Sequence, residues 1–336
     1  MNNQRTVYLD VIRIIACMMV IIMHAPIPGI GAEGHGPFLV LISYLTVPCV
    51  PLFFMVSGAL LLPCRKEVTA IGYLKKRIGK VAGPTVAFSL LYVIINNSKN
   101  WPISILSIPF SAQGHGILWF MYTLIGLYLL VPIISPWIRQ ASKRELEIYL
   151  LLWMVTQCYP YLSLFLEVNS SNTGILYYFT GYTGYFLLGY YLNRYPVSLK
   201  WLLPLAILML PLPLLNKVFG WDLDFYSVFW YLSAPVTIMT ATWFVGLKRQ
   251  CEIFALNIKL STISGLSFGI YLIHILIMRT LLWNWDVIRE IPNYYLQTAV
   301  TALFTFIGSY VVCKIISYLP YSQYVIGYTE RNKTKH

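Results

Sequence analysis

The first apolar stretch of the chain holds three side chains that are costly inside a lipid bilayer. Asp10, Arg13 and His24 all fall within the run VYLDVIRIIACMMVIIMH. With about 100° of rotation per helical residue, Arg13 and His24 lie about 20° apart on the helical wheel, and Asp10 lies about 40° from His24. The three residues therefore share one helix face. Ionisable residues within a membrane-spanning helix are usually functional, which makes this face the first candidate site.

His24 is the residue of this face best suited to catalysis. A neutral imidazole accepts a proton near neutral pH, so it can act as a general base toward a hydroxyl group. His24 also lies two residues before Pro26, where the helix is expected to end. In the alternative interpretation, His24 only bonds to a backbone carbonyl, while Asp10 and Arg13 form an ion pair between positions i and i+3. We predict a catalytic or substrate-binding role for His24.

A basic cluster precedes the third apolar stretch, in the sequence YLKKRIGKVAGP. This cluster, whose Lys76 is a further candidate for cofactor binding, could also serve only to orient the helix in the membrane. Arg77 and Lys80, however, are one helical turn apart and could bind a phosphate together, Arg through paired donors and Lys as a point charge. Arg13 lies about 16 Å from His24 along a helix axis, comparable to the extended pantetheine arm of coenzyme A. A cofactor that enters from the cytoplasm could span that distance.

Two further residues admit two interpretations each. His274, in SFGIYLIHILI, is flanked by apolar residues and is either a buried histidine bonded to a neighbouring helix or a part of the site. Trp119 belongs either to the aromatic belt at the membrane interface or to a surface that binds a sugar ring. The six cysteines show no C-x-x-C spacing, so we expect neither a metal site nor a disulfide framework.

The composition shows which elements must position these residues. Of 336 residues, 58% are hydrophobic and 11% are charged, so most of the chain is expected to lie in lipid. The fold class predicted is an all-α integral membrane protein that forms a single transmembrane domain over residues 1–336. Ten spans are predicted, at about 7–27, 38–63, 79–97, 116–138, 147–167, 174–193, 200–217, 227–246, 266–283 and 295–319.

The prolines predict breaks within two of these spans. Pro48 and Pro51 fall in the second span, and Pro204, Pro211 and Pro213 fall in the seventh. Proline lacks an amide hydrogen and clashes with the preceding turn, so these helices should be broken or kinked. Broken helices in membranes commonly line a cavity.

The net charge of +12 follows the ends of the predicted spans and does not form a nucleic-acid-binding patch. Lys and Arg concentrate in alternate loops, and outside the spans only Lys99, Lys217 and Arg289 fall in the opposite set. Because positive charge accumulates on the cytoplasmic side, both termini are expected to be cytoplasmic.

Six segments, in order along nearly the whole chain, are similar to motifs of one known family. They are YLDVIRIIACMMVIIMH at 8–24, PLFFMVSGALLL at 51–62, YLKKRIGK at 73–80, LWFMYTLIGLYLLVP at 118–132, GYFLLGYYL at 184–192 and SFGIYLIH at 267–274. Together they resemble the acyltransferase 3 family of bacterial integral membrane acyltransferases. The chain looks closest to the single-domain branch that includes the O-acetyltransferase of enterobacterial common antigen.

The resemblance implies transfer of an acyl group, usually acetyl from acetyl-CoA, to a hydroxyl of a cell-surface or lipid-linked glycan in the bacterial cytoplasmic membrane. It implies that His24 is the catalytic histidine and Arg13 its motif partner. Arg77 and Lys80 match an Arg-x-x-Arg site, with lysine in the second place. Ser57, followed by glycine, matches a Ser-Gly pair that we interpret as a close helix approach beside the site.

A transporter or flippase for the same glycan or its lipid carrier is the alternative from another class. Broken helices and embedded charges are also typical of transporters. The absence of an apparent internal repeat in the sequence weighs mildly against this alternative.

Overall fold

The computed structural model describes residues 7–29, 35–64, 69–95, 100–111, 116–162, 166, 174–221, 223–254 and 260–330. Within these residues the chain is helical and contains no β-strand, which confirms the predicted fold class of a helical membrane protein. The helices of more than seven residues are α1 (Val7–His24), α2 (Gly36–Thr46), α3 (Cys49–Leu61), α4 (Ala70–Ile95), α6 (Trp119–Gln140), α7 (Lys143–Gln157), α9 (Thr183–Arg194), α10 (Leu199–Met209), α11 (Leu212–Phe219), α13 (Ala234–Ile253), α14 (Ser261–Thr280) and α16 (Tyr294–Ser317).

Shorter helices connect these elements. They are α5 (Trp101–Ser107), α8 (Tyr159–Leu162), α12 (Phe225–Val228), α15 (Asp286–Arg289) and α17 (Gln323–Ile326), with 3₁₀ turns η1 (Gly116–Leu118), η2 (Tyr177–Phe179) and η3 (Leu282–Asn284).

Seven helical segments within the described residues are long and apolar enough to cross a membrane. They are α1, α2 with α3, α4, α6, α10 with α11, α14 with η3, and α16. The other three predicted spans coincide with α7 and α8, with α9, and with α13. Helices α7 and α9 have 15 and 12 residues, fewer than the roughly 20 that a span needs. Helix α13 ends in the polar sequence LKRQCEI, so the total of ten spans remains a prediction.

The predicted breaks occur at two prolines. Helix α2 ends at Thr46 and α3 begins at Cys49, with Pro48 at the N-cap, so the second span is two helices. Pro211 likewise caps α11 after α10 has ended at Met209. Proline can occupy the start of a helix without loss of a hydrogen bond, because the first amides of a helix have no partner within it.

Two element boundaries differ most from the sequence prediction. Helix α4 begins at Ala70 and not near residue 79. The basic residues before the apolar stretch are also helical, so they extend the helix toward its N-terminus. The sixth predicted span, 174–193, is helical mainly from Thr183, and Gly181 before it has a φ of +93°. Such a backbone conformation favours glycine and does not continue an α-helix.

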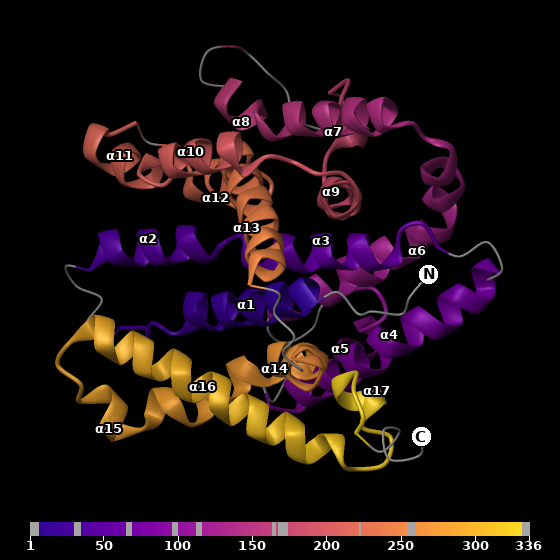
Figure 1. Cartoon of the computed structure of the whole chain (residues 1–336). Helices are drawn as coiled ribbons and strands as arrows, with labels where there is room; N and C mark the ends of the chain where they lie inside the picture. The colour runs from indigo at the N-terminus through magenta and orange to yellow at the C-terminus, as the bar shows by residue number, and fades with distance from the viewer. Residues whose placement is uncertain are drawn as a thin grey trace.

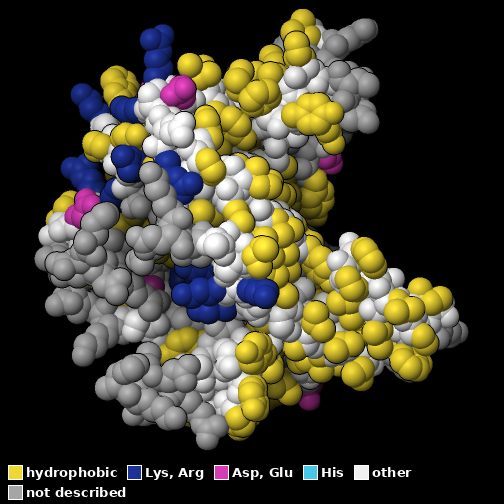
Figure 2. All heavy atoms as spheres, turned by 90° about the vertical axis from the view of Figure 1, so that its right-hand side faces the viewer, with side chains coloured by type: hydrophobic (Ala, Val, Ile, Leu, Met, Phe, Trp, Pro, Cys, Tyr) yellow, Lys and Arg dark blue, Asp and Glu magenta, His cyan; other side chains and the backbone are white. Residues whose placement is uncertain are grey.

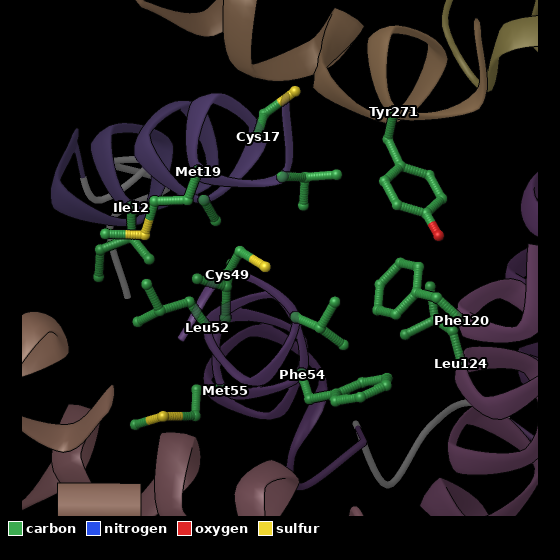
Figure 3. Packing of buried hydrophobic residues seen from close by; sticks show 14 of the residues in the cluster. Ile12, Cys17, Met19, Cys49, Leu52, Phe54, Met55, Phe120, Leu124 and Tyr271 are labelled. Atoms are coloured by element: carbon green, nitrogen blue, oxygen red, sulfur yellow. The ribbon is translucent and has the colours of Figure 1, made fainter. Parts of the chain in front are cut away.

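Helix α1 occupies the centre of the bundle, between α2 and α3 on one side and α14 and α16 on the other (Figure 1). Its face toward α3 is filled by Ile12 and Met19, and α3 supplies Leu52 and Met55 to the same apolar layer (Figure 3). This central position means that the polar residues of α1 face protein and not lipid.

Helix α3 also packs closely against α9. A Cβ atom at Gly58 would lie 1.8 Å from the carbonyl oxygen of Phe186, so only glycine allows this separation of the two backbones. The close helix approach predicted beside Ser57 is therefore present, and it fixes the position of α3 relative to the bundle.

Lys and Arg side chains gather on the end of the bundle shown in Figure 2, which is the side of Figure 1 where α17 lies. Hydrophobic side chains cover much of the flank on the right of the same view (Figure 2). This end of the molecule is therefore basic, in agreement with the alternation of charge along the sequence.

Candidate functional site

A cavity of about 260 Å³ lies between α1, α3, α4, α6 and α14 and contains most of the cationic residues predicted from the sequence. Arg13 from α1 and Arg77 and Lys80 from α4 all line it, together with Ser57 from α3. Lys76, on the same turn of α4, is exposed and does not line the cavity. The structure thus brings the predicted phosphate-binding pair and Arg13 together and leaves Lys76 outside.

Asp10 has a different role from its neighbours on α1. Its side chain is 5% exposed, and its Oδ1 accepts a hydrogen bond of 2.6 Å from Ser264 Oγ of α14. Ser264 also lines the cavity, whereas Asp10 does not. Asp10 therefore connects α1 to α14 beside the cavity, a contact with a helix distant in sequence that the helical wheel could not predict.

A second cavity, of about 350 Å³, contains His24. Its walls come from the end of α1, the start of α3 and the segments around residues 116–119 and 226–231. Trp119, Tyr226, Trp230 and Tyr231 supply aromatic surfaces to it. The Trp119 ring also packs on Tyr231, with ring centroids 5.5 Å apart. The sequence singled out Trp119 in this group but missed the other three aromatic residues.

His274 lies directly beside His24. The two imidazole centroids are 5.6 Å apart, and the ring planes are inclined at 34°. His274 is fully buried, and its Nδ1 bonds to the carbonyl oxygen of Tyr271 in the preceding turn. Its Nε2 has no hydrogen-bond partner among the described residues. The interpretation of His274 as a histidine bonded to another helix is therefore incomplete, since one ring nitrogen is bonded within its own helix and the ring contacts the predicted base.

Tyr271 is the residue shared by the two cavities. It lines both of them and is only 4% exposed. Its ring extends from α14 toward Phe120 of α6 (Figure 3), and the two ring centroids are 5.2 Å apart. Phe53 of α3 completes this aromatic layer at 6.5 Å from Tyr271. Phe53 and Phe120 line the basic cavity, and Tyr271 is the ring of this layer that also reaches the cavity that contains His24.

Sequence reasoning did not select Tyr271, although it lies in the quoted motif SFGIYLIH. It is three residues before His274, so both side chains point to the same side of α14. This three-residue spacing from His274 was the feature of the sequence that could have identified Tyr271 as a site residue.

The helical bundle thus contains a cavity lined by cationic residues and a cavity that contains His24, and Tyr271 lines both. Residues 6–318 match the family model described as an acyltransferase domain. The chain belongs to the acyltransferase 3 family, and it is a multi-pass membrane acyltransferase. No curated protein and no solved structure matches the chain significantly.

Proposed function

We propose that this protein transfers an acetyl group from acetyl-CoA to a hydroxyl of a cell-surface or lipid-linked glycan, in the bacterial cytoplasmic membrane. The observation that carries the proposal is the pair of cavities that meet at Tyr271, one lined by three cationic residues and the other by His24 and aromatic rings. The nucleotide of acyl-CoA and a glycan differ in chemistry, and the two cavities would provide a binding surface for each, with the acyl group brought to His24.

The basic cavity supports binding of the acyl-CoA donor. Arg77 and Lys80 present a bidentate donor and a point charge to the phosphates. The rise along α1 from Arg13 to His24 is about 16 Å, so a pantetheine arm that starts at the basic end can bring its thioester to His24. The ring of Tyr271 lies on this route and must turn aside for the acyl group to pass.

His24 would act as the general base. Its unprotonated ring nitrogen takes the proton of the acceptor hydroxyl while that oxygen attacks the thioester carbonyl carbon. The new C–O bond forms as the C–S bond breaks, and the CoA thiolate leaves toward the basic cavity. His274, in contact with the His24 ring, would hold that ring in place.

The second cavity supports an acceptor that carries sugar rings. Faces of Trp and Tyr combine an apolar surface with a polar edge, a combination that suits pyranose rings. A further cavity, of about 770 Å³, is lined mostly by apolar residues, among them Phe229, and the next residue along the chain, Trp230, lines the His24 cavity. The chain of a lipid-linked acceptor would need such an apolar surface.

Purified protein in detergent tests the proposal directly. The protein should release free CoA from acetyl-CoA and transfer labelled acetyl groups to a lipid extract that contains glycan acceptors. A flippase or transporter would move such a lipid without consuming acetyl-CoA. If folded protein supplied with acceptor shows neither release of CoA nor transfer of acetyl groups, the proposal is contradicted.

A further inference from the structure

Residues that follow the last long helix close the basic cavity. The segment 323–330, which we term the C-terminal clamp, consists of α17 and the residues after it. Gly327 and Tyr328 of the clamp line the cavity together with Arg77 and Lys80. The family match ends at residue 318, so no family motif assigns a role to the clamp.

Two glycines of α14 form the surface on which the clamp rests. A Cβ atom at Gly265 would lie 2.5 Å from Cε2 of Tyr328, and one at Gly269 would lie 2.9 Å from Cβ of Ile326. Ile326 is fully buried. The two glycines are four residues apart and lie on one face of α14. The clamp therefore packs in direct contact with α14 over at least one helical turn.

Polar contacts hold the other side of the clamp. The hydroxyl of Tyr328 donates a hydrogen bond of 2.8 Å to Glu330 Oε2, and Lys314 Nζ of α16 lies 3.2 Å from the same carboxylate oxygen. The backbone amide of Glu330 donates to the carbonyl of Ser317 at 3.0 Å. The Tyr328 ring is therefore fixed both at its edge against Gly265 and at its hydroxyl.

The clamp lies at the end of the cavity away from the aromatic layer. Gly265 precedes Tyr271 by six residues of α14, a rise of about 9 Å toward the basic end. At that end the cavity presents an aromatic ring beside Arg77 and Lys80. An aromatic ring next to a pair of phosphate-binding cations matches the two parts of a nucleotide, a planar base and its phosphates.

We propose that Tyr328 stacks on the adenine of the acyl-CoA donor, and that the C-terminal clamp is the nucleotide-binding wall of the cavity. The inference rests on the proposed function, because it takes acyl-CoA as the donor. Tyr328 would bind the nucleotide without touching the thioester. Its contribution should appear in the affinity for ligands that contain adenine and be absent for ligands that lack it.

The experiment compares two ligands and two variants. Isothermal titration calorimetry on the full-length protein in detergent would measure Kd for CoA and for pantetheine, which lacks both the adenosine and the phosphates. Tyr328→Ala should weaken CoA binding about tenfold or more, because an aromatic side chain stacked on a base contributes strongly to affinity. The same variant should leave pantetheine binding unchanged. Tyr328→Phe keeps the ring, loses only the bond to Glu330, and should bind CoA nearly as the wild type does.

The outcomes separate this inference from the proposed donor. If the wild type binds CoA and Tyr328→Ala binds it with the same Kd, the adenine site is overturned and the proposed donor is not. Equal losses for CoA and pantetheine would also overturn it, since they would mean that the clamp supports only the helices around the cavity. A wild-type protein that binds no CoA would overturn the proposed donor, and the adenine site with it.

Discussion

The imidazole rings of His24 and His274 face each other with their centroids 5.6 Å apart, although they come from α1 and α14, which are far apart along the chain. The contact places a second titratable ring beside the proposed base. It also joins the last turn of α1 to the middle of α14, so the geometry of the site depends on how these two helices pack.

Replacement of His24 should abolish most transfer while the protein stays folded. General-base catalysis contributes about 10²–10⁴-fold, so His24→Ala should lose at least the lower of these factors in acetyl transfer per folded molecule. His24→Gln keeps a hydrogen-bonding group but cannot take the proton, and it should fail nearly as badly. Near wild-type transfer by either variant would remove His24 as the base.

His274 should matter less than His24, and in a different way. His274→Ala removes the ring that packs against His24, so we expect a partial loss of specific activity together with reduced thermal stability. The measurement is acetyl transfer normalised to folded protein, with melting temperature measured on the same sample. A loss of transfer as deep as that of His24→Ala, with stability retained, would make His274 the base instead.

Removal of the phosphate-binding pair should act on donor binding. The double variant Arg77→Ala/Lys80→Ala should raise the KM for acetyl-CoA about tenfold or more with little change in kcat, because contacts remote from the thioester act on the ground state and the transition state alike. Lys76→Ala is the matched control, since it removes a neighbouring charge that does not line the cavity. Equal effects of the control and the double variant would mean that the cluster acts only through its total positive charge and does not bind the phosphates at a defined site.

Opening the aromatic layer should uncouple cleavage of acetyl-CoA from transfer of the acetyl group to the acceptor. Tyr271→Ala would join the two cavities, so water should reach the thioester and acetyl-CoA should be hydrolysed in the absence of acceptor. Release of CoA thiol, followed with a thiol reagent, measures this leak. Tyr271→Phe keeps the ring and should remain coupled. If Tyr271→Ala shows no acceptor-independent hydrolysis, then the ring does not separate the donor from water.

The orientation in the membrane can be tested by reporter fusions. Fusions after residues 70, 142 and 255 should report the cytoplasmic side, and those after 33, 107 and 290 the external side, because Lys and Arg concentrate in alternate loops. These positions bracket the less apolar segments α7, α9 and α13. A single reversed pair would contradict the ten-span arrangement.

Local patterns in the sequence predicted the features that local chemistry determines. The break at Pro48 follows from the missing amide hydrogen, and the shared face of Arg13 and His24 follows from helical rotation. The sequence did not predict that Arg13 and Arg77 line one cavity, because they belong to helices that are far apart along the chain.

Features that depend on which helices pack together could not be predicted in the same way. The contact between His24 and His274, and the bond between Asp10 and Ser264, require that α1 lie against α14, and neither helix sequence specifies its neighbour. Tyr328 was missed because it follows the last apolar stretch. The glycines at 265 and 269 were a signal, since small residues spaced i and i+4 permit close approach of another segment.

The aromatic layer at Tyr271 also bears on the electrical state of the membrane. Water in two cavities that approach from opposite ends would concentrate the transmembrane voltage across the thin layer between them, where each elementary charge experiences about 2.3 kcal/mol per 100 mV. The edge-to-face packing of Tyr271 against Phe120 would be the barrier to ions at that point. Under the proposed function, an acyl group would pass between compartments while insulation against ion flow depends on a few aromatic rings.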